Sequence, residues 1–210
     1  MTSRKIDHIV YAVQDLSATM VQFEEKSGIK PIFGGFHKSF GTKNALVALG
    51  NGCYLELLAA DDTNTEVPKP RWMGIDLLQK NQITRWALKS NQLKVDSAIL
   101  KSSNPEMGSI RSGSRNVSNG GLLQWDLIMP LPHPEVEMLP FMVDWGKSEI
   151  HPTDEIPKMG CRLIELYGSH PTPEKFESTF AQLNIDFHIK TSTEIKLSAR
   201  IECPNGRIEI

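Results

Sequence analysis

The same order of predicted elements occurs at both ends of this 210-residue chain, and each copy closes on an Asn-Gly turn. Residues 5–60 predict a strand, a helix and three further strands, the last two joined by Gly-Asn-Gly at 50–52. Residues 158–210 repeat this order and join their last two strands through Asn-Gly at 205–206. Asn-Gly between apolar runs is the strongest short-range signal for a β-hairpin. A repeated supersecondary module therefore limits the folds that this chain can adopt.

The helix of the first copy has signals at both ends and an apolar face. Asp15 is placed to cap its first turn, and Gly28 is placed to end it. Leu16, Met20 and Phe23 recur at helical spacing between these two residues. The pattern predicts a helix that packs one side against the strands.

The middle of the chain predicts a third copy, although its signals are less regular. We expect its helices and strands at Met73–Thr84 (helix), Arg85–Lys89 (strand), Lys94–Lys101 (helix), Met107–Ser112 (strand), Leu123–Leu127 (strand, after a turn at 119–121) and Phe141–Trp145 (strand). Paired units with curled sheets can close around a cavity. The predicted fold class is α+β, with repeated βαβββ modules forming a curled antiparallel or mixed sheet around a concave cavity.

Charge and cysteine content exclude several classes of function. Lys and Arg number 23 against 25 Asp and Glu, a net charge of −2, so nothing indicates binding to nucleic acid or to an anionic membrane. No stretch approaches the roughly 20 apolar residues that span a bilayer, and the first residues show no signal peptide. Cys53, Cys161 and Cys203 lack the spacing of a metal site and lie in apolar stretches. We expect a reduced, cytoplasmic protein whose partner is a small molecule.

Familiar catalytic motifs are missing from the sequence. It contains no Gly-x-Gly-x-x-Gly, no Walker loop and no Gly-x-Ser-x-Gly, and no base stands next to a cysteine. Nucleotide binding and covalent catalysis are therefore not predicted.

Ionisable residues occupy the first and last strand of each copy when the copies are aligned. An imidazole and a carboxylate on inward faces of one curled sheet suit acid–base catalysis or a divalent cation. The aligned pairs, from the first, middle and last copy, are His8 and Glu56, Arg85 and Asp144, and Arg162 and Glu209.

Several segments, in this order, resemble the glyoxalase-like branch of the vicinal oxygen chelate superfamily, which includes glyoxalases, bleomycin resistance proteins and dioxygenases. They are Ile6–Leu16, Gly34–His37, Gly41–Asn44, Tyr54–Leu57 and Phe141–Gly146 followed by His151-Pro152. The resemblance covers about residues 4–152. It implies that two βαβββ units form one concave sheet, in which metal enzymes take a ligand from the first and last strand of each unit.

Carried over by position, the four sites that the resemblance implies are His8, Glu56, Arg85 and Asp144. Arg85 departs from the pattern, because a guanidinium stays protonated and has no lone pair for a metal. If the third copy takes the place of the middle one, the aligned position is again an arginine, Arg162. We therefore predict no cofactor and no stoichiometric metal, since Arg85 disfavours a divalent cation.

Structural roles compete with these functional ones. His8 could be a strand histidine hydrogen-bonded in place, and Glu56, in an apolar strand, needs a partner that Arg85 could supply as a salt bridge. His37 could turn into the pocket or into solvent. Trp125 could pack in the core or against a ligand.

The sequence predicts a protein that binds a small organic molecule in the sheet-lined cavity, with proton transfer by His8 and Glu56 as catalytic residues. His37, Arg85, Trp125 and Asp144 are its expected substrate-binding residues. One alternative is a metal-dependent lyase, isomerase or dioxygenase of the vicinal oxygen chelate type. Another is a non-catalytic binding or sequestration protein.

Two parts of the chain are expected to differ in role. Residues 1–152 form the paired glyoxalase-like domain, and residues 158–210 form a third module. A lone module of this size has a small core and an exposed sheet edge, so it must pack against another unit within the chain or across a dimer axis. Because the number of units is odd, we predict a homodimer with the third module at or near its interface.

Overall fold

Twelve strands form one mixed sheet in the computed structural model, which describes residues 4–116 and 122–210. The turn predicted at 119–121 lies outside these residues. Helices are packed on the sheet and the predicted α+β class is confirmed. Within the described ranges, no helix has the length and apolar character needed to cross a membrane.

The first module follows the predicted order. Its elements are β1 (Ile6–Ala12), α1 (Leu16–Ser27), β2 (Ile32–His37), β3 (Thr42–Ala48) and β4 (Tyr54–Ala60). The carboxylate of Asp15 caps α1 by accepting a hydrogen bond from the Ala18 N–H at 3.0 Å, and Gly28 ends the helix with a left-handed φ of 77°. After α1 crosses over the sheet, β2, β3 and β4 pair in turn and β4 returns parallel to β1.

The second module repeats this architecture. Its elements are β5 (Gln82–Lys89), α2 (Leu93–Ser103), β6 (Ile110–Asn116), β7 (Leu122–Ile128) and β8 (Phe141–Asp144). A 3-10 segment, η1 (Trp72–Leu77), precedes the module. The helix predicted at Met73–Thr84 is wrong. Met73 and Gly74 both have positive φ, which ends the helical turn, and Pro134 packs 2.7 Å from where a Cβ on Gly74 would lie.

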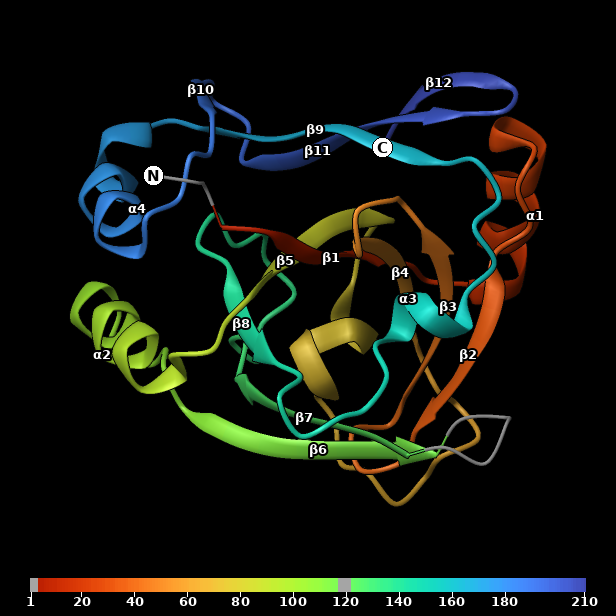
Figure 1. Cartoon of the computed structure of the whole chain (residues 1–210), viewed down its shortest axis with the longest axis horizontal. Helices are drawn as coiled ribbons and strands as arrows, with labels where there is room; N and C mark the ends of the chain where they lie inside the picture. The colour runs from red at the N-terminus through yellow and green to blue at the C-terminus, as the bar shows by residue number, and fades with distance from the viewer. Residues whose placement is uncertain (1–3, 117–121) are drawn as a thin grey trace.

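The two modules join through antiparallel pairing of β1 with β5. The resulting order β2-β3-β4-β1-β5-β8-β7-β6 curves, so that its outer strands approach each other around α3 (Pro152–Glu155) (Figure 1). The sheet thus has a concave face toward α3 and a convex face toward α1 and α2. Ile9, Leu55 and Trp86 belong to the large convex core, whereas Val10 and Val143 belong to a smaller concave cluster.

The third module keeps the element order but changes the strand pairing. Its elements are β9 (Arg162–His170), η2 (Pro173–Phe176), α4 (Glu177–Leu183), β10 (Ile189–Thr191), β11 (Lys196–Cys203) and β12 (Gly206–Glu209). Here the first strand, β9, pairs parallel with the short β10 and antiparallel with β11, and β12 pairs with β11. In the first module the first strand instead pairs with the last. The third module is therefore a repeat in sequence order but not in sheet order.

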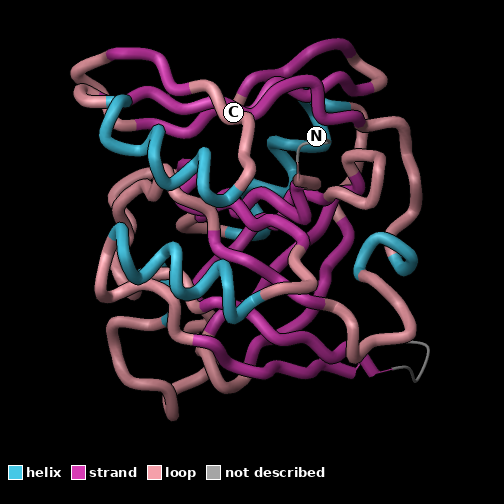
Figure 2. The backbone as a smooth tube through the Cα atoms, turned by 60° about the vertical axis from the view of Figure 1, so that its left-hand side comes forward, coloured by secondary structure: helices cyan, strands magenta, loops and turns pink. Residues whose placement is uncertain are grey.

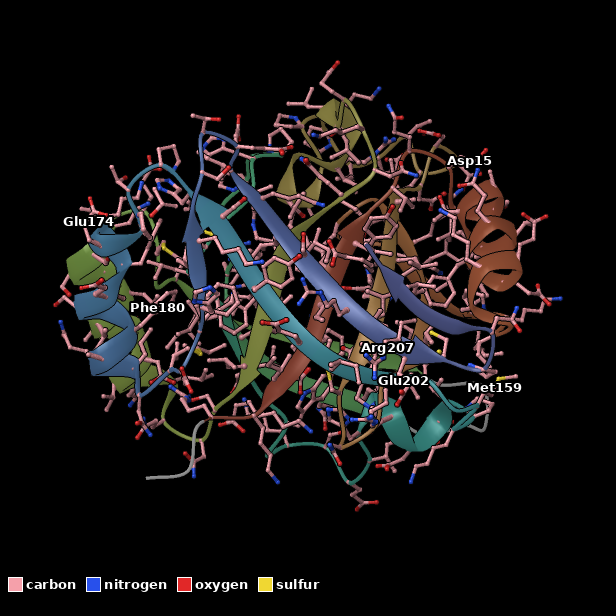
Figure 3. The ribbon with its side chains drawn as sticks, turned by 90° about the horizontal axis from the view of Figure 1, so that it is seen from above. Asp15, Met159, Glu174, Phe180, Glu202 and Arg207 are labelled. Atoms are coloured by element: carbon pink, nitrogen blue, oxygen red, sulfur yellow. The ribbon has the colours of Figure 1, made fainter. Side chains whose placement is uncertain are left out.

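The third module covers the convex face of the paired sheet. Its strands cross above β1, β4 and β5, and α4 lies beside α2 (Figures 1 and 3). The backbone view in Figure 2 shows this upper layer of strands with the two helices at its side. Phe180, Leu197 and Ile201 join the same core as Trp86, and the Trp86 ring stacks on Phe187 with centroids 4.4 Å apart. The module thus packs within its own chain, and the homodimer stays a prediction.

The aligned positions of the third module do not form a site. Arg162 pairs with Glu202 at 2.6 Å, and Glu209 pairs with Arg200 at 2.9 Å, all four side chains being exposed by about two fifths or more. These are surface ion pairs, which usually contribute little to stability.

Candidate functional site

A small cavity of about 60 Å³ lies on the concave face of the paired sheet. Four of the predicted site residues line it, namely His8, His37, Glu56 and Trp125. Its other walls are mainly aromatic and aliphatic side chains: Phe40, Asn44, Leu46, Tyr54, Trp72, Leu123, Leu127, Phe141, Val143, Trp145 and Pro152. Ligand sites commonly combine such apolar walls with a few polar groups.

A β-bulge at Asp7 arranges the polar end of the cavity. Ile6 pairs with Leu88 and His8 pairs with Ala87, so Asp7 has no partner of its own on β5. Strict alternation would send Asp7 and His8 to opposite faces of the sheet. Because the bulge re-aims these side chains, the carboxylate of Asp7 reaches the ring of its neighbour.

The Asp7 carboxylate is fully buried and accepts three side-chain hydrogen bonds. His8 Nδ1 lies 2.7 Å from Oδ1, while Trp145 Nε1 and His151 Nε2 lie 2.9 and 3.0 Å from Oδ2. Burial alone would raise the pKa of Asp7, but the hydrogen bonds from His151 and His8 outweigh it and hold this pKa well below its ordinary value. Asp7 is therefore an ionised, oriented acceptor behind the cavity wall.

His8 is held so that one ring nitrogen remains for a ligand. Its ring stacks on Tyr54 with centroids 4.8 Å apart and meets the Phe141 ring edge-on at 5.3 Å. With Nδ1–H donated to Asp7, the neutral imidazole carries its lone pair on Nε2. This geometry is that of a histidine oriented by a carboxylate to act as a base.

Glu56 lies on β4 beside His8 and is almost fully buried. The amide of Asn44 donates to its Oε1 at 2.7 Å. Its Oε2 is 3.9 Å from His8 Nε2, beyond hydrogen-bond distance, so both atoms can contact the same ligand group. Asn44 also approaches His37 Nε2 at 3.4 Å, and His37 Nδ1 lies 3.0 Å from the Thr42 hydroxyl. The predicted Glu56–Arg85 salt bridge is wrong, since Asn44 is the partner.

Two pairs of rings form much of the apolar wall. Phe40 stacks on Trp72 at 4.4 Å, and Trp125 packs against Trp145 at 5.4 Å. The Trp72 Nε1–H is buried without a hydrogen-bond acceptor among the described residues. Pro152, the first residue of α3, closes one end of the cavity.

Arg85, a predicted substrate-binding residue, does not line the cavity. Its fully buried guanidinium donates to backbone carbonyls of the segment before β8, including those of Leu131 and His133 at 3.2 and 2.6 Å. Its Nε lies 3.3 Å from the carboxylate of Glu137. Burial lowers the pKa of Arg85, with Glu137 opposing that effect, and burial raises the pKa of Glu137. Arg85 therefore anchors a chain segment.

Asp144 does not line the cavity either. Phe141 and Val143 on β8 do, and Asp144 follows Val143 with the opposite facing. Its carboxylate accepts a hydrogen bond from the Gly146 N–H at 2.8 Å. A shift of one residue in a strand alignment turns every side chain to the other face, and this explains the incorrect placement.

The donor set of the cavity does not fit a metal ion. The first module offers His8 Nε2 and Glu56, but the second module presents Phe141 and Val143 from β8, which have no donor atoms. In residues 4–116 and 122–210, no group of three or more His, Cys, Asp and Glu side chains is placed to hold a metal. His37 is a third possible ligand on the cavity wall, but it does not form such a group with His8 and Glu56, whereas catalytic zinc sites typically use three protein ligands.

Sequence reasoning missed Asp7, Asn44, Trp145 and His151. Strict alternation along the strand would send Asp7 and His8 to opposite faces, and a bulge leaves no clear sequence signal. His151-Pro152 stood out only as part of a resemblance, although His151 meets Asp7 across 144 positions. Cys53 can be set aside as a nucleophile, because burial raises its pKa to about 12.

Comparisons with known proteins agree with this architecture. The family model described as a glyoxalase-like domain matches residues 6–184, which extends beyond the paired modules into α4. No curated protein matches the chain significantly. A crystal structure of a hypothetical protein from Staphylococcus aureus is similar over 99% of this chain and 84% of that one, with 18% identity and a TM-score of 0.65.

Methylmalonyl-CoA epimerases are also among the similar structures. The Mycobacterium tuberculosis enzyme is 20% identical, with a TM-score of 0.43, over 69% of this chain and 91% of that one. A Streptomyces coelicolor epimerase variant in complex with 2-nitronate-propionyl-CoA is 18% identical, with a TM-score of 0.45, over 71% and 99%.

Proposed function

Because this chain belongs to the family of glyoxalase-like domains, we propose that it binds a small organic molecule in the concave cavity and moves a proton on it with His8 and Glu56. The observation that carries the proposal is the line of groups from Asp7 through His8 to Glu56. Asp7 orients His8 at 2.7 Å, and His8 Nε2 and Glu56 Oε2 flank the same space 3.9 Å apart.

The proposed reaction is proton transfer at a carbon next to a carbonyl group. One of the two bases takes the proton, so the C–H bond breaks and its electron pair moves onto the carbonyl oxygen. We assign the donor to that oxygen to the Trp72 N–H, which is buried and has no acceptor among the described residues. The conjugate acid formed in this way exchanges its proton with solvent or with the second base, and one of the two bases then returns a proton to carbon. When His8 takes the proton, ionised Asp7 stabilises the imidazolium.

Deuterium exchange tests the proposal without requiring the natural substrate. Hydroxyacetone, butanone and acetonyltrimethylammonium are incubated with the protein in D₂O, and NMR follows the loss of their α-proton signals. We expect faster exchange with the wild-type protein than with buffer. His8→Asn and Glu56→Gln should each reduce the enzymatic rate by about 100-fold or more.

A charge-matched control is Glu24→Gln, on the exposed side of α1, which should leave exchange unchanged. Absence of protein-catalysed exchange for all three ketones would contradict the proposal. Binding without exchange would instead favour the sequestration function. Metal analysis of protein purified without chelators addresses the metal-dependent alternative, which predicts stoichiometric zinc, manganese, nickel or iron that His8→Ala removes.

We also propose a cytoplasmic location. It is supported by the three buried cysteines, Cys53, Cys161 and Cys203, which are all free.

A further inference from the structure

We infer that the ligand of this cavity is a small organic cation, an ammonium group held between aromatic rings and the Glu56 carboxylate. The inference rests on the proposed function only in taking this cavity as the binding site. It adds the charge and the chemical class of the ligand, which the proton-transfer proposal leaves open.

Charge is the first observation. Among the described residues that line the cavity, Glu56 is the one carboxylate and none is a lysine or arginine. Asp7 adds a second buried carboxylate directly behind His8, and the ammonium of Lys89, 4.0 Å from Asp7, balances one of the two. These two carboxylates and one ammonium sum to a net charge of about −1 before any histidine is counted. An electrostatic field of this sign attracts a cation.

The Glu56 carboxylate has unused hydrogen-bonding capacity. Asn44 supplies one neutral donor to Oε1, while Oε2 is 3.9 Å from the nearest ring nitrogen of His8. Burying a carboxylate without a counter-charge has a free-energy cost. A cationic group in the cavity would pair with it directly and lower that cost.

Aromatic rings are the second, independent observation. Phe40 and Trp72 form a stacked pair and Trp125 and Trp145 form a tilted pair, and all four rings line the same cavity as Glu56. The negative face of an aromatic ring attracts an organic cation, most strongly for tryptophan, and several rings together recognise substituted ammonium groups. The cavity volume of about 60 Å³ suits a head group rather than a large ligand.

Among the described residues, an anionic head group would find no lysine or arginine in the cavity wall. Arg85 is enclosed by backbone carbonyls outside the cavity. Lys38 lines an outer groove between the β2–β3 turn and β6, beyond His37 and Phe40. A carboxylate or phosphate that entered the cavity would therefore meet Glu56 at close range.

The test compares choline with 3,3-dimethyl-1-butanol, in which carbon replaces the charged nitrogen at nearly the same size. Binding to the full-length protein is measured by isothermal titration and by quenching of tryptophan fluorescence. We expect choline to bind about tenfold more tightly or better. Glu56→Gln and Trp125→Leu should each reduce this preference several-fold, with folding checked by circular dichroism. Glu24→Gln should leave it unchanged.

Equal affinity for the two alcohols, or a preference for choline that survives both cavity variants, would overturn the inference. The outcome is separable from the proton-transfer proposal. Choline preference without deuterium exchange supports the cation site and contradicts the catalytic proposal. Exchange of neutral ketones with no preference for choline supports the catalytic proposal and contradicts the cation site.

Discussion

At the scale of single residues, the site depends on a carboxylate that does not line the cavity. Asp7 is enclosed by His8, Trp145 and His151, and its bonds fix the ring on which the proposed base lies. Such a partner sets the tautomer and orientation of a histidine without touching the ligand. Asp7 is in this sense a positioning residue.

Replacing Asp7 by asparagine should reduce deuterium exchange by about 100-fold, because the amide no longer imposes the Nδ1–H tautomer on His8. Nitrogen-15 NMR of the imidazole should show the change in tautomer directly. Asp144→Asn is the matched control, since Asp144 lies outside the cavity. Equal losses in the two variants, or an unchanged His8 spectrum in Asp7→Asn, would contradict the positioning role.

The same residue should make stability depend on pH. The pKa of Asp7 is lower in the folded protein than its ordinary value of 3.8, so the unfolded chain binds the proton more readily. The stabilising contribution is then fully present above about pH 4–5 and is lost as the pH falls further. Urea unfolding between pH 2.5 and 6 should show a shallower acid decline for Asp7→Asn than for the wild type. Parallel curves would refute this assignment.

His8 and Glu56 could be predicted to face one cavity because a resemblance and a strand alignment placed both on inward faces. Asp7 and His151 could not, since a bulge and a contact across 144 positions determine their roles. The predicted placement of Asp144 in the cavity is wrong, because an alignment error of one residue turns a strand side chain to the other face of the sheet.

At the scale of elements, Arg85 holds the segment before β8 against β5 and η1. Arg85→Leu should destabilise the protein by about 3–5 kcal/mol, because Glu137 and several carbonyls lose their partner in a buried place. Denaturant unfolding measures this cost. Arg85→Lys should recover little, since an ammonium cannot replace the planar fork. A variant of wild-type stability would show that the anchor contributes nothing.

Element order was predictable where turns and caps have strong local chemistry. Asp15, Gly28 and the turns at 50–52 and 205–206 mark boundaries that the structure confirms. The segment at η1 was not predictable, because packing against Pro134 imposes the backbone of Met73 and Gly74.

At the scale of the whole molecule, the third module completes the core of the other two. Truncation after residue 157 would expose the convex face around Ile9, Leu55 and Trp86 to water. We expect this fragment to lose its cooperative unfolding transition and to aggregate, as judged by circular dichroism and sedimentation. A monomeric fragment that unfolds cooperatively would instead show that residues 1–157 are an independent domain.

The proposed function requires His8 and Glu56 to act on one proton in one cavity, and a double-mutant cycle tests this most directly. Deuterium exchange is measured for the wild type, His8→Asn, Glu56→Gln and the double variant. Residues that act as a unit give non-additive losses. We predict that the exchange rate of the double variant is only slightly below that of the less active single variant. Losses that multiply, or exchange that survives both substitutions, would contradict the account.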